Sequence, residues 1–370
     1  MTKKPKKIGL ISSRRFVLIN LLLRRQKNFI LFIGIGFFIT GVAYPHHNIA
    51  MWVGFILAAY SAVANDSIQT IGTFIASNGN QKWWKLWLYI GLIFIITVSV
   101  SWFSYNGDVT YQRLASKGFT ESPQSFNFLQ IAAPLFLLIL TRLRMPVSTT
   151  FLILSSFSGS AAAITGVMQK SIVGYFIAFI SAFIIWIAFE RLMQHKFKGK
   201  AGNQWIIFQW ITSGFLWSLW IMQDAANIAV YLPRSLSVTE FLVFIFTIFL
   251  GLGLIFFLKG DKIQEVVEEK SDVKDVRPAT IIDLVYTFIL IIFTWVNTVP
   301  MSTTWVFIGL LGGRELAKKI KKKGKLKATW KLIGKDISYA LFGLIVSVII
   351  ALSANPKLSE EVYQYLKNYL

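Results

Sequence analysis

The chain has 370 residues, of which 55% are hydrophobic and only 15% charged, and this balance excludes an ordinary soluble protein. The absence of cysteine and the three scattered histidines exclude a disulfide framework, a cysteine nucleophile and a His/Cys metal cluster. Its net charge of +21 would indicate nucleic-acid binding only if the basic residues formed a stripe on a folded surface. Instead, nine of the 38 basic residues lie in 3–27 and ten in 314–335, and both runs border apolar segments. The composition therefore predicts a membrane protein in contact with the lipid bilayer, with no nucleic acid as a partner.

Eleven apolar segments are long enough, or nearly long enough, to cross a bilayer, which takes about 20 residues. Two of them, 126–140 and 303–313, fall short. We therefore expect an all-α polytopic fold. In chain order the segments are 29–44, 51–76, 84–105, 126–140, 147–167, 172–189, 205–232, 241–258, 280–299, 303–313 and 337–352.

Lysine and arginine predict the orientation, because cytoplasmic loops of membrane proteins retain an excess of both. With the basic N-terminus inside, the basic residues of 82–85, 191–200 and 314–335 also fall inside, whereas loop 106–124 and the C-terminal tail fall outside. No removable signal peptide is evident. The prediction is a multi-pass protein of the cell (inner) membrane with a cytoplasmic N-terminus.

Two polar motifs each occur twice among these apolar segments. Patches with one aspartate and two amides lie at 64–69 and 222–227, and Pro-x-Ser-Thr-Thr lies at 146–150 and 300–304. Five apolar segments separate the copies, and an odd number reverses the direction of crossing. The sequence therefore predicts two inverted five-segment repeats preceded by one extra helix, with the motifs near the membrane midplane.

The predicted organisation leaves the path of the chain at each Pro-x-Ser-Thr-Thr motif open. Each motif either joins two spanning helices or forms the tip of a re-entrant hairpin. We favour two hairpins, because an 11-residue helix cannot cross and a proline at the turn frees backbone N–H groups. The expected parts are a basic cytoplasmic N-terminus (1–28), an extra helix and outer loop (29–50), a first repeat (51–191), a cytoplasmic linker (192–204), a second repeat (205–352) with charged cytoplasmic loops (259–279 and 314–335), and a C-terminal tail (353–370).

The aspartate patches indicate a site for a coupling ion. An ionised aspartate in a spanning helix costs about 2.5 to 3.5 kcal/mol, which implies a partner cation or a proton. The alternative is a polar clamp in which amides satisfy each other between helices. Helical spacing puts three side chains on one face in each patch: Asn65, Asp66 and Gln69 in the first, and Gln223, Asp224 and Asn227 in the second. We expect the two aspartates and two glutamines to hold the coupling ion, with Na⁺ at Asp66 and Asp224 as the metal candidate.

The hydroxyl-rich motifs indicate a site for an anion. Hydroxyl donors followed by a helix start suit a tetrahedral oxyanion. Pro-x-Ser-Thr-Thr is also a simple helix cap, but its duplication beside duplicated aspartates favours binding. Arg234 is interpreted as an interfacial anchor, and Arg142 and Arg144 either as cytoplasmic anchors or as anion contacts. The predicted substrate-binding residues are Ser148, Thr149, Thr150, Ser302, Thr303, Thr304, Asn65 and Asn227.

The order of the four motifs is that of a known family. Residues 64–66, 72–73, 224 and 226–227 match Gly-Ala-Asn-Asp-Val-Ala-Asn-Ala-x-Gly-Thr, and both Pro-x-Ser-Thr-Thr motifs match the later Pro-x-Ser-Thr-Thr-His. The whole repeat pair thus resembles the inorganic phosphate transporter (PiT) family, as a divergent bacterial-type member. The sequence departs from the pattern at Val63, Gln69, Gln223, Phe151 and Trp305, the last two standing where the family keeps histidine.

The resemblance implies a secondary transporter of inorganic phosphate that works by alternating access, not an enzyme, with no cofactor besides a coupling ion. Sodium is slightly preferred over a proton, since an aspartate among oxygen ligands suits a hard cation. Both aspartates favour phosphate, which keeps a proton to donate, over sulfate, which keeps none. A sulfate or other oxyanion permease is the alternative, and a membrane-embedded lipid-phosphate enzyme a remote one. The oligomeric state stays open, a homodimer included.

Overall fold

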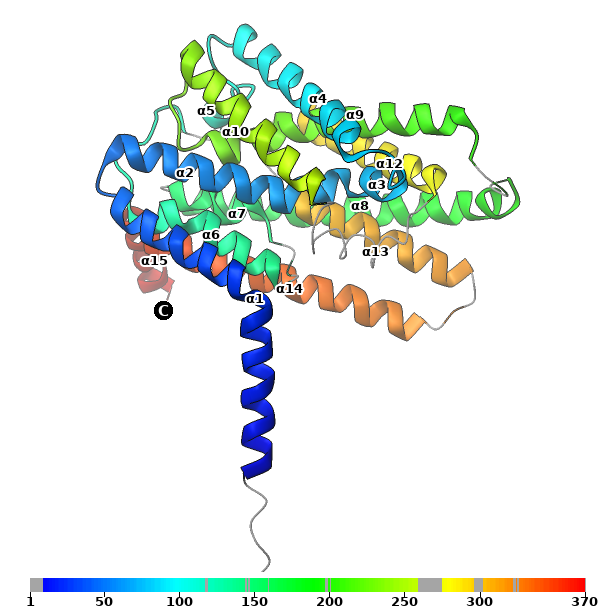
Figure 1. Cartoon of the computed structure of the whole chain (residues 1–370), viewed down its shortest axis with the longest axis horizontal. Coiled ribbons are helices and arrows are strands. Elements are labelled where there is room, and N and C mark those ends of the chain that lie inside the picture. The colour runs from blue at the N-terminus through cyan, green and yellow to red at the C-terminus, as the bar shows by residue number, and fades with distance from the viewer. Residues whose placement is uncertain are drawn as a thin grey trace, which may run out of the picture.

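The computed structural model of the chain describes residues 9–116, 119–143, 145, 147–158, 160–196, 199, 201–258, 275–295, 302–321, 324 and 326–369. Within these residues every regular element is a helix, and eight helices are long and apolar enough to cross a membrane. The predicted all-α polytopic fold is confirmed (Figure 1). The elements are α1 (Gly9–Ala43), α2 (His47–Ala62), η1 (Val63–Ser67), α3 (Ile68–Ser77), α4 (Trp83–Ser104), α5 (Arg113–Ser116), α6 (Phe128–Arg142), α7 (Thr149–Leu152), η2 (Leu154–Phe157), α8 (Ala161–Lys196), α9 (Asn203–Ala229), α10 (Val238–Phe257), α12 (Val276–Trp295), α13 (Thr303–Lys321), α14 (Leu326–Ala354) and α15 (Pro356–Tyr369).

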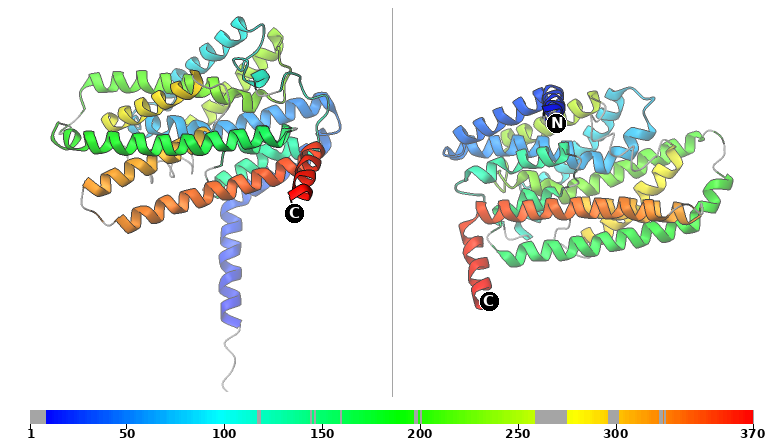
Figure 2. Two further views of the ribbon diagram at one scale, coloured as in Figure 1. Left: turned by 180° about the vertical axis from the view of Figure 1, so that it is seen from behind. Right: turned by 90° about the horizontal axis from the view of Figure 1, so that it is seen from below.

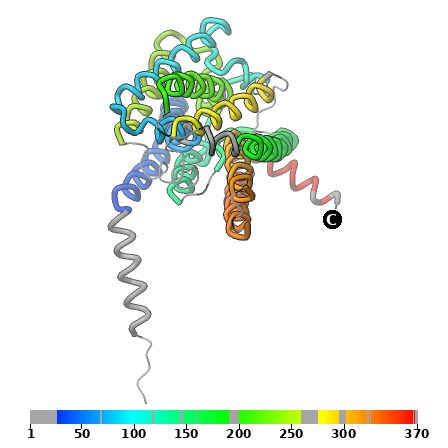
Figure 3. The backbone as a smooth tube through the Cα atoms, turned by 90° about the vertical axis from the view of Figure 1, so that its right-hand side faces the viewer, coloured from blue at the N-terminus to red at the C-terminus, as the bar shows by residue number. Residues whose placement is uncertain are grey.

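The long helices form two packed groups. On one side α4 packs against α9 and α10, and α9 packs against α12, while on the other α13 packs along α8 and against α14 (Figure 2). Seen along the bundle, α13 and α14 lie at the side opposite to α4 and α10 (Figure 3). The short helix α7 contacts both α9 and α14, so it lies between the two groups.

The first aspartate lies at a break in what the sequence predicts as one apolar segment. Helix α2 is followed by a single π-helical stretch, η1, and then by α3. A π-helical turn widens the backbone spiral locally and is common at functional sites. Asp66 lies in that stretch, so the break changes the direction of its carboxylate relative to a regular helix.

The first Pro-x-Ser-Thr-Thr motif lies on a hairpin that enters and leaves at the same end of the molecule. Its first arm is α6, whose N-cap residue Asn127 forms a capping box with Gln130. Its second arm is α7 followed by the 3-10 helix η2. The Asn127 amide donates a hydrogen bond to the Ala354 carbonyl, and the Asn355 amide donates to the Ser158 carbonyl at 2.8 Å. Both ends of this hairpin therefore meet the end of α14.

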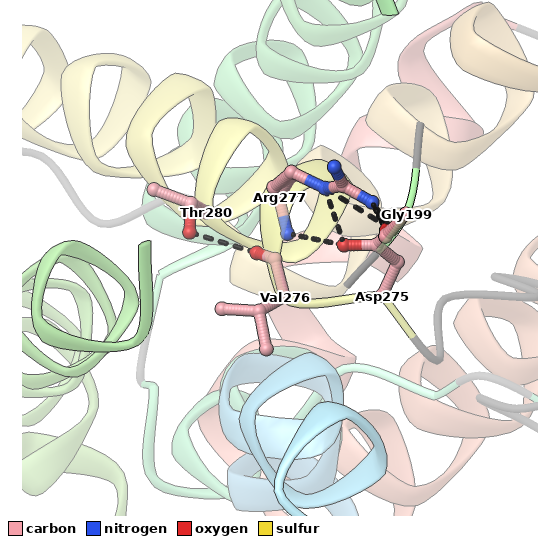
Figure 4. A network of polar contacts seen from close by, with 5 residues as sticks. All are labelled: Gly199, Asp275, Val276, Arg277 and Thr280. Atoms are coloured by element: carbon pink, nitrogen blue, oxygen red, sulfur yellow. Dashed lines mark hydrogen bonds and ion pairs between the residues drawn. The ribbon is translucent and has the colours of Figure 1, made fainter. Parts of the chain in front are cut away.

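The second motif lies on a hairpin that opens toward the other end, with α12 and α13 as its arms. The Arg277 guanidinium, at the start of α12, donates hydrogen bonds to Asp275 and to the Gly199 carbonyl, just beyond α8 (Figure 4). The Arg314 guanidinium, further along α13, lies 5.2 Å from the centre of the Trp186 ring in the second half of α8. Both arms therefore approach the same end of α8.

Several predicted boundaries differ from the structure. Segment 147–167 is not one apolar span, because α7, η2 and a turn precede Ala161, where α8 begins. Segment 303–313 is too short, because α13 continues to Lys321 and accommodates Arg314 against an aromatic ring. The predicted tail contains α15, which starts at a proline, a residue favoured at the first helical position.

Some predictions fall outside the described residues. These are the residues Pro146, Pro300 and Arg144, and the part 259–274 of the predicted charged loop. The division into repeats 51–191 and 205–352 stays a prediction.

Candidate functional site

In the first half of the chain the aspartate patch meets the hydroxyl motif. The Asn65 amide donates hydrogen bonds to Asp66 Oδ1 at 2.6 Å and to the Val147 carbonyl at 2.9 Å. The Thr149 hydroxyl donates to the other carboxylate oxygen, Asp66 Oδ2. One oxygen of the carboxylate thus faces an amide and the other a threonine of the hairpin.

The second half repeats this arrangement around Asp224. The Asn227 amide donates to Asp224 Oδ1 at 2.8 Å, and the Thr303 hydroxyl donates to Asp224 Oδ2 at 2.8 Å. Thr149 and Thr303 hold the same position in their two motifs, so each aspartate receives the equivalent hydroxyl. Ser148 and Ser302 cap the helices that follow them, since each hydroxyl oxygen accepts a backbone N–H at 3.3 Å, from Phe151 and Trp305 respectively.

Two hydrogen bonds join the halves into one site. The Asn227 amide also donates to Thr150 Oγ1 at 3.0 Å, and the Thr304 hydroxyl donates to the Val147 carbonyl at 3.4 Å. The Phe151 and Trp305 rings meet edge to face, 6.3 Å apart, where the resembling family keeps two histidines. Ten predicted residues are thus gathered, and none is more than 4% exposed: Asn65, Asp66, Ser148, Thr149, Thr150, Asp224, Asn227, Ser302, Thr303 and Thr304.

The two predicted glutamine ligands behave differently. The Gln69 amide donates to Asn65 Oδ1 at 3.3 Å, so this side chain stays beside the first aspartate. The Gln223 amide instead donates to Thr294 Oγ1 at 2.7 Å and to the Leu290 carbonyl at 3.4 Å, both on α12. The Gln223 side chain therefore contacts α12, whereas Gln69 contacts a residue of its own patch.

The site concentrates negative charge among buried side chains, since Asp66 and Asp224 are both buried. Two buried carboxylates within one low-dielectric centre repel each other, and each costs free energy unless a cation or a proton compensates it. Asn227 Oδ1 is buried and has no hydrogen-bond partner in the described part of the chain. Among the described residues no three His, Asp or Glu side chains are grouped as a multivalent metal would require. The carboxylate oxygens and Asn227 Oδ1 are acceptors, so the centre can take up a proton, a cation or a ligand that donates hydrogen bonds.

Three hydroxyl residues of the site were missed by the sequence analysis. The Thr141 hydroxyl donates to Asn65 Oδ1 at 3.0 Å, and Ser171 Oγ accepts the Ser302 N–H at 2.8 Å. The Tyr286 hydroxyl donates to the Thr303 carbonyl at 3.0 Å. Each lies singly in an apolar segment, where such residues are common, so the sequence carried no signal that would single them out.

A third buried carboxylate, Asp283 on α12, was not predicted as a site residue, although its position within an apolar segment is unusual for an aspartate. Asp283 is 1% exposed, and it accepts hydrogen bonds from the Thr73 hydroxyl at 2.6 Å and the Ser213 hydroxyl at 2.5 Å. An ionisable residue within a predicted span is unusual enough to mark a functional candidate. Arg142, in contrast, contacts α1, because its Nε donates a hydrogen bond to Gln26 Oε1 at 3.0 Å.

The fold and the site define a class: a multi-pass helical membrane protein with a buried polar centre. A solved structure named "The sodium-dependent phosphate transporter" is similar, with a TM-score of 0.58 and 15% sequence identity. The match covers 88% of this chain and 99% of that chain. No family model matches the sequence, and no curated protein matches it.

Proposed function

We propose that the chain is a secondary active transporter of inorganic phosphate across the cytoplasmic (inner) membrane, with its N-terminus in the cytoplasm. The observation that carries the proposal is the pair of equivalent centres, Thr149 with Asp66 and Thr303 with Asp224, joined by Asn227 and Thr150. The similar solved transporter has phosphate in its name, and the same motifs resemble a phosphate transporter family. Transport then proceeds by alternating access, as the hairpins move around one central site.

The hydrogen-bonding capacity of the centre favours phosphate over sulfate. The centre offers acceptors, namely two carboxylates and the unpartnered Asn227 Oδ1. Phosphate near neutral pH keeps at least one proton that it can donate to such an acceptor, whereas sulfate keeps none. A buried acceptor left without a donor costs about 1 to 3 kcal/mol, which is a discrimination of roughly 5-fold to 150-fold. A sulfate permease is the alternative, and it would leave Asn227 Oδ1 unsatisfied.

The carboxylates also require a coupling cation. An anion joins two aspartates in one buried centre only if positive charge enters with it. Sodium suits this role, because carboxylate, amide and carbonyl oxygens surround the centre, as a hard cation prefers. A proton bound by one aspartate would serve the same purpose and is the alternative.

Uptake of labelled phosphate into proteoliposomes tests the proposal. Asp66→Asn and Asp224→Asn should each lower the uptake rate by about 30-fold or more, because each removes a charge from a hydrogen-bonded buried pair. Glu121→Gln, in an exposed loop, is the matched control and should transport normally. Wild-type rates in both aspartate variants would refute the central site. Varying Na⁺ and pH independently identifies the coupling ion, and uptake that follows only the pH gradient would overturn the preference for sodium.

A further inference from the structure

A cavity of about 250 Å³ lies between the first hairpin and the start of α8. One wall is the second arm of the first hairpin, with Thr150, Leu154, Ser155 and Ser158. The other walls are the start of α8, with Ala162, Ala163, Ile164, Gly166 and Val167, and the loop residues Ser116 and Phe119. Thr150 Oγ1 also accepts the hydrogen bond from the Asn227 amide, so the cavity is lined by a residue of the proposed binding site.

The solvent exposure of the lining residues decreases from the mouth of the cavity toward Thr150, as expected along a route of access. Ala162, Ala163 and Ser116 are exposed, whereas Thr150 and Ser155 are 2% and 6% exposed. Four of the lining residues carry hydroxyl groups in a segment that is otherwise apolar. Hydroxyl groups can replace part of the hydration shell of an oxyanion at each step, which leucine or alanine cannot do.

The loop beside the cavity is held in place by one arginine. Arg234 Nε donates to the Phe119 carbonyl at 2.8 Å, and its Nη2 donates to the Glu121 carbonyl at 2.8 Å. Burial lowers the pKa of Arg234 to about 10, and the charge of Asp108 opposes this shift. The predicted role of Arg234 as an anchor therefore fits its contacts, since backbone carbonyls occupy its donors.

A second arginine of the loop, Arg113, has no such anchoring role. It is 7% exposed, and no hydrogen bond from its guanidinium is found within the part of the chain that the structure describes. It lies on α5, three residues before Ser116, and α5 packs against α9, which carries Asp224 and Asn227. Burial lowers the pKa of Arg113, and the negative charge of Asp224 opposes this shift.

We propose that this cavity is the route by which the oxyanion reaches the central site from the outer face, and that Arg113 attracts the anion into it. A buried guanidinium that makes no hydrogen bond to the described residues suits an anion, because it presents several N–H groups to oxygen. The inference rests on the proposed function and on the predicted orientation. Its test is chosen so that the route and the substrate can fail separately.

The absence of cysteine makes the route directly testable. Single variants Ser155→Cys and Ala163→Cys each place the chain's one thiol on the cavity wall, and a charged, membrane-impermeant methanethiosulfonate is added outside intact cells. Glu121→Cys, in the exposed outer loop, is the positive control. Phe176→Cys is the negative control, because Phe176 is 56% exposed on α8 and does not line the cavity.

We expect both cavity variants to react, and phosphate at ten times its Kd to slow the reaction of Ser155→Cys by about tenfold, in proportion to occupancy. Protection by sulfate and not by phosphate would support the route and refute the proposed substrate. Reaction without protection by either anion would refute the cavity as an anion route. A reactive Glu121→Cys beside two unreactive cavity variants would also refute it, since lipid or another copy would then cover the opening.

The role of Arg113 is tested by measuring whether its substitution changes KM or kcat. Arg113→Gln should raise the KM for phosphate uptake by about tenfold with kcat within about twofold, because the lost attraction acts before the anion reaches the aspartates. Arg113→Lys keeps the charge and should restore most of the affinity. An unchanged KM in Arg113→Gln, or a lysine variant no better than the glutamine variant, would overturn this role.

Discussion

A methyl group added at Gly309 should separate the second hairpin from α8. A Cβ atom at this position would lie 2.3 Å from the Tyr175 carbonyl oxygen and 3.1 Å from its carbonyl carbon. Backbone atoms within α8 cannot rotate away as a side chain can. Gly309→Ala therefore forces the two helices apart near the hydrogen bond that joins Ser302 N–H to Ser171 Oγ.

The size of the effect follows from these distances. Ordinary contact begins at 3.4 Å, so α13 must shift by about 1 Å in a packed interior. Overpacking of this kind costs about 1 to 3 kcal/mol, of which alanine recovers about 1 kcal/mol through its better helix propensity. Thr303 lies on the same helix, 2.8 Å from Asp224, and a misplacement of about 1 Å in a site can lower a rate by about 100-fold.

Melting of the purified protein and phosphate uptake into proteoliposomes measure the two effects separately. Gly309→Ala should lower both the melting temperature and the uptake rate. Gly334→Ala on α14 is the matched control, because no atom lies within 4 Å of the added methyl, and it should be neutral or slightly stabilising. A Gly309→Ala protein that melts and transports like the control would refute the close packing of α13 on α8.

Three further substitutions test other contacts. Thr303→Val keeps the shape of the side chain but removes the hydroxyl donor to Asp224, so phosphate uptake should fall by about 5-fold to 10-fold while the melting temperature changes little. Asp283→Ala leaves two buried hydroxyls without an acceptor and should lower the free energy of unfolding by about 1 to 3 kcal/mol, whereas Asp283→Asn, which keeps an acceptor, should cost less. Burial alone would raise the pKa of Asp275, but hydrogen bonds from Arg277 outweigh it and lower that pKa, so the ionised form stabilises the fold above about pH 4. Asp275→Asn should therefore melt lower than wild type at pH 7, and the difference should vanish as pH falls through the lowered pKa; a constant difference would refute the link.

Most residues of the candidate site could be predicted from the duplicated motifs. The aspartates and the Ser-Thr-Thr hydroxyls recur at nearly constant separation, so the sequence alone predicts that equivalent groups come together, and the structure brings ten of the twelve predicted residues together around the two aspartates. Gln69 stays at the edge of that group, beside Asn65. Gln223 is the exception, because a shared helix face does not decide which neighbouring helix a long side chain contacts.

Hydropathy was a weaker guide to the hairpins. Segment 147–167 has the apolar composition of a spanning helix, yet it is divided into α7, η2 and the start of α8. The division follows from a tertiary contact, because Ser158, at the end of the first hairpin, is hydrogen-bonded to Asn355. Helix α13 continues past its apolar part because the Trp186 ring covers Arg314, a contact between segments more than 100 residues apart. Neither outcome could be predicted from local sequence, because each depends on which helices become neighbours.

The two hairpins carry the same motif but differ in how their second arms are packed. Helix α13 lies along α8 with glycines at its contact, and Gly313, like Gly309, leaves no room for a Cβ beside the α8 backbone. The equivalent arm of the first hairpin is divided into α7 and η2, packs against α14, and leaves the 250 Å³ cavity beside α8. Inverted repeats transport by exchanging conformations across a fixed site. Under the proposed mechanism, the cavity beside Thr150 and the tight contact at Gly309 therefore belong to one conformational state. Access from the opposite side of the membrane then requires the cavity to close and the contact between α13 and α8 to loosen.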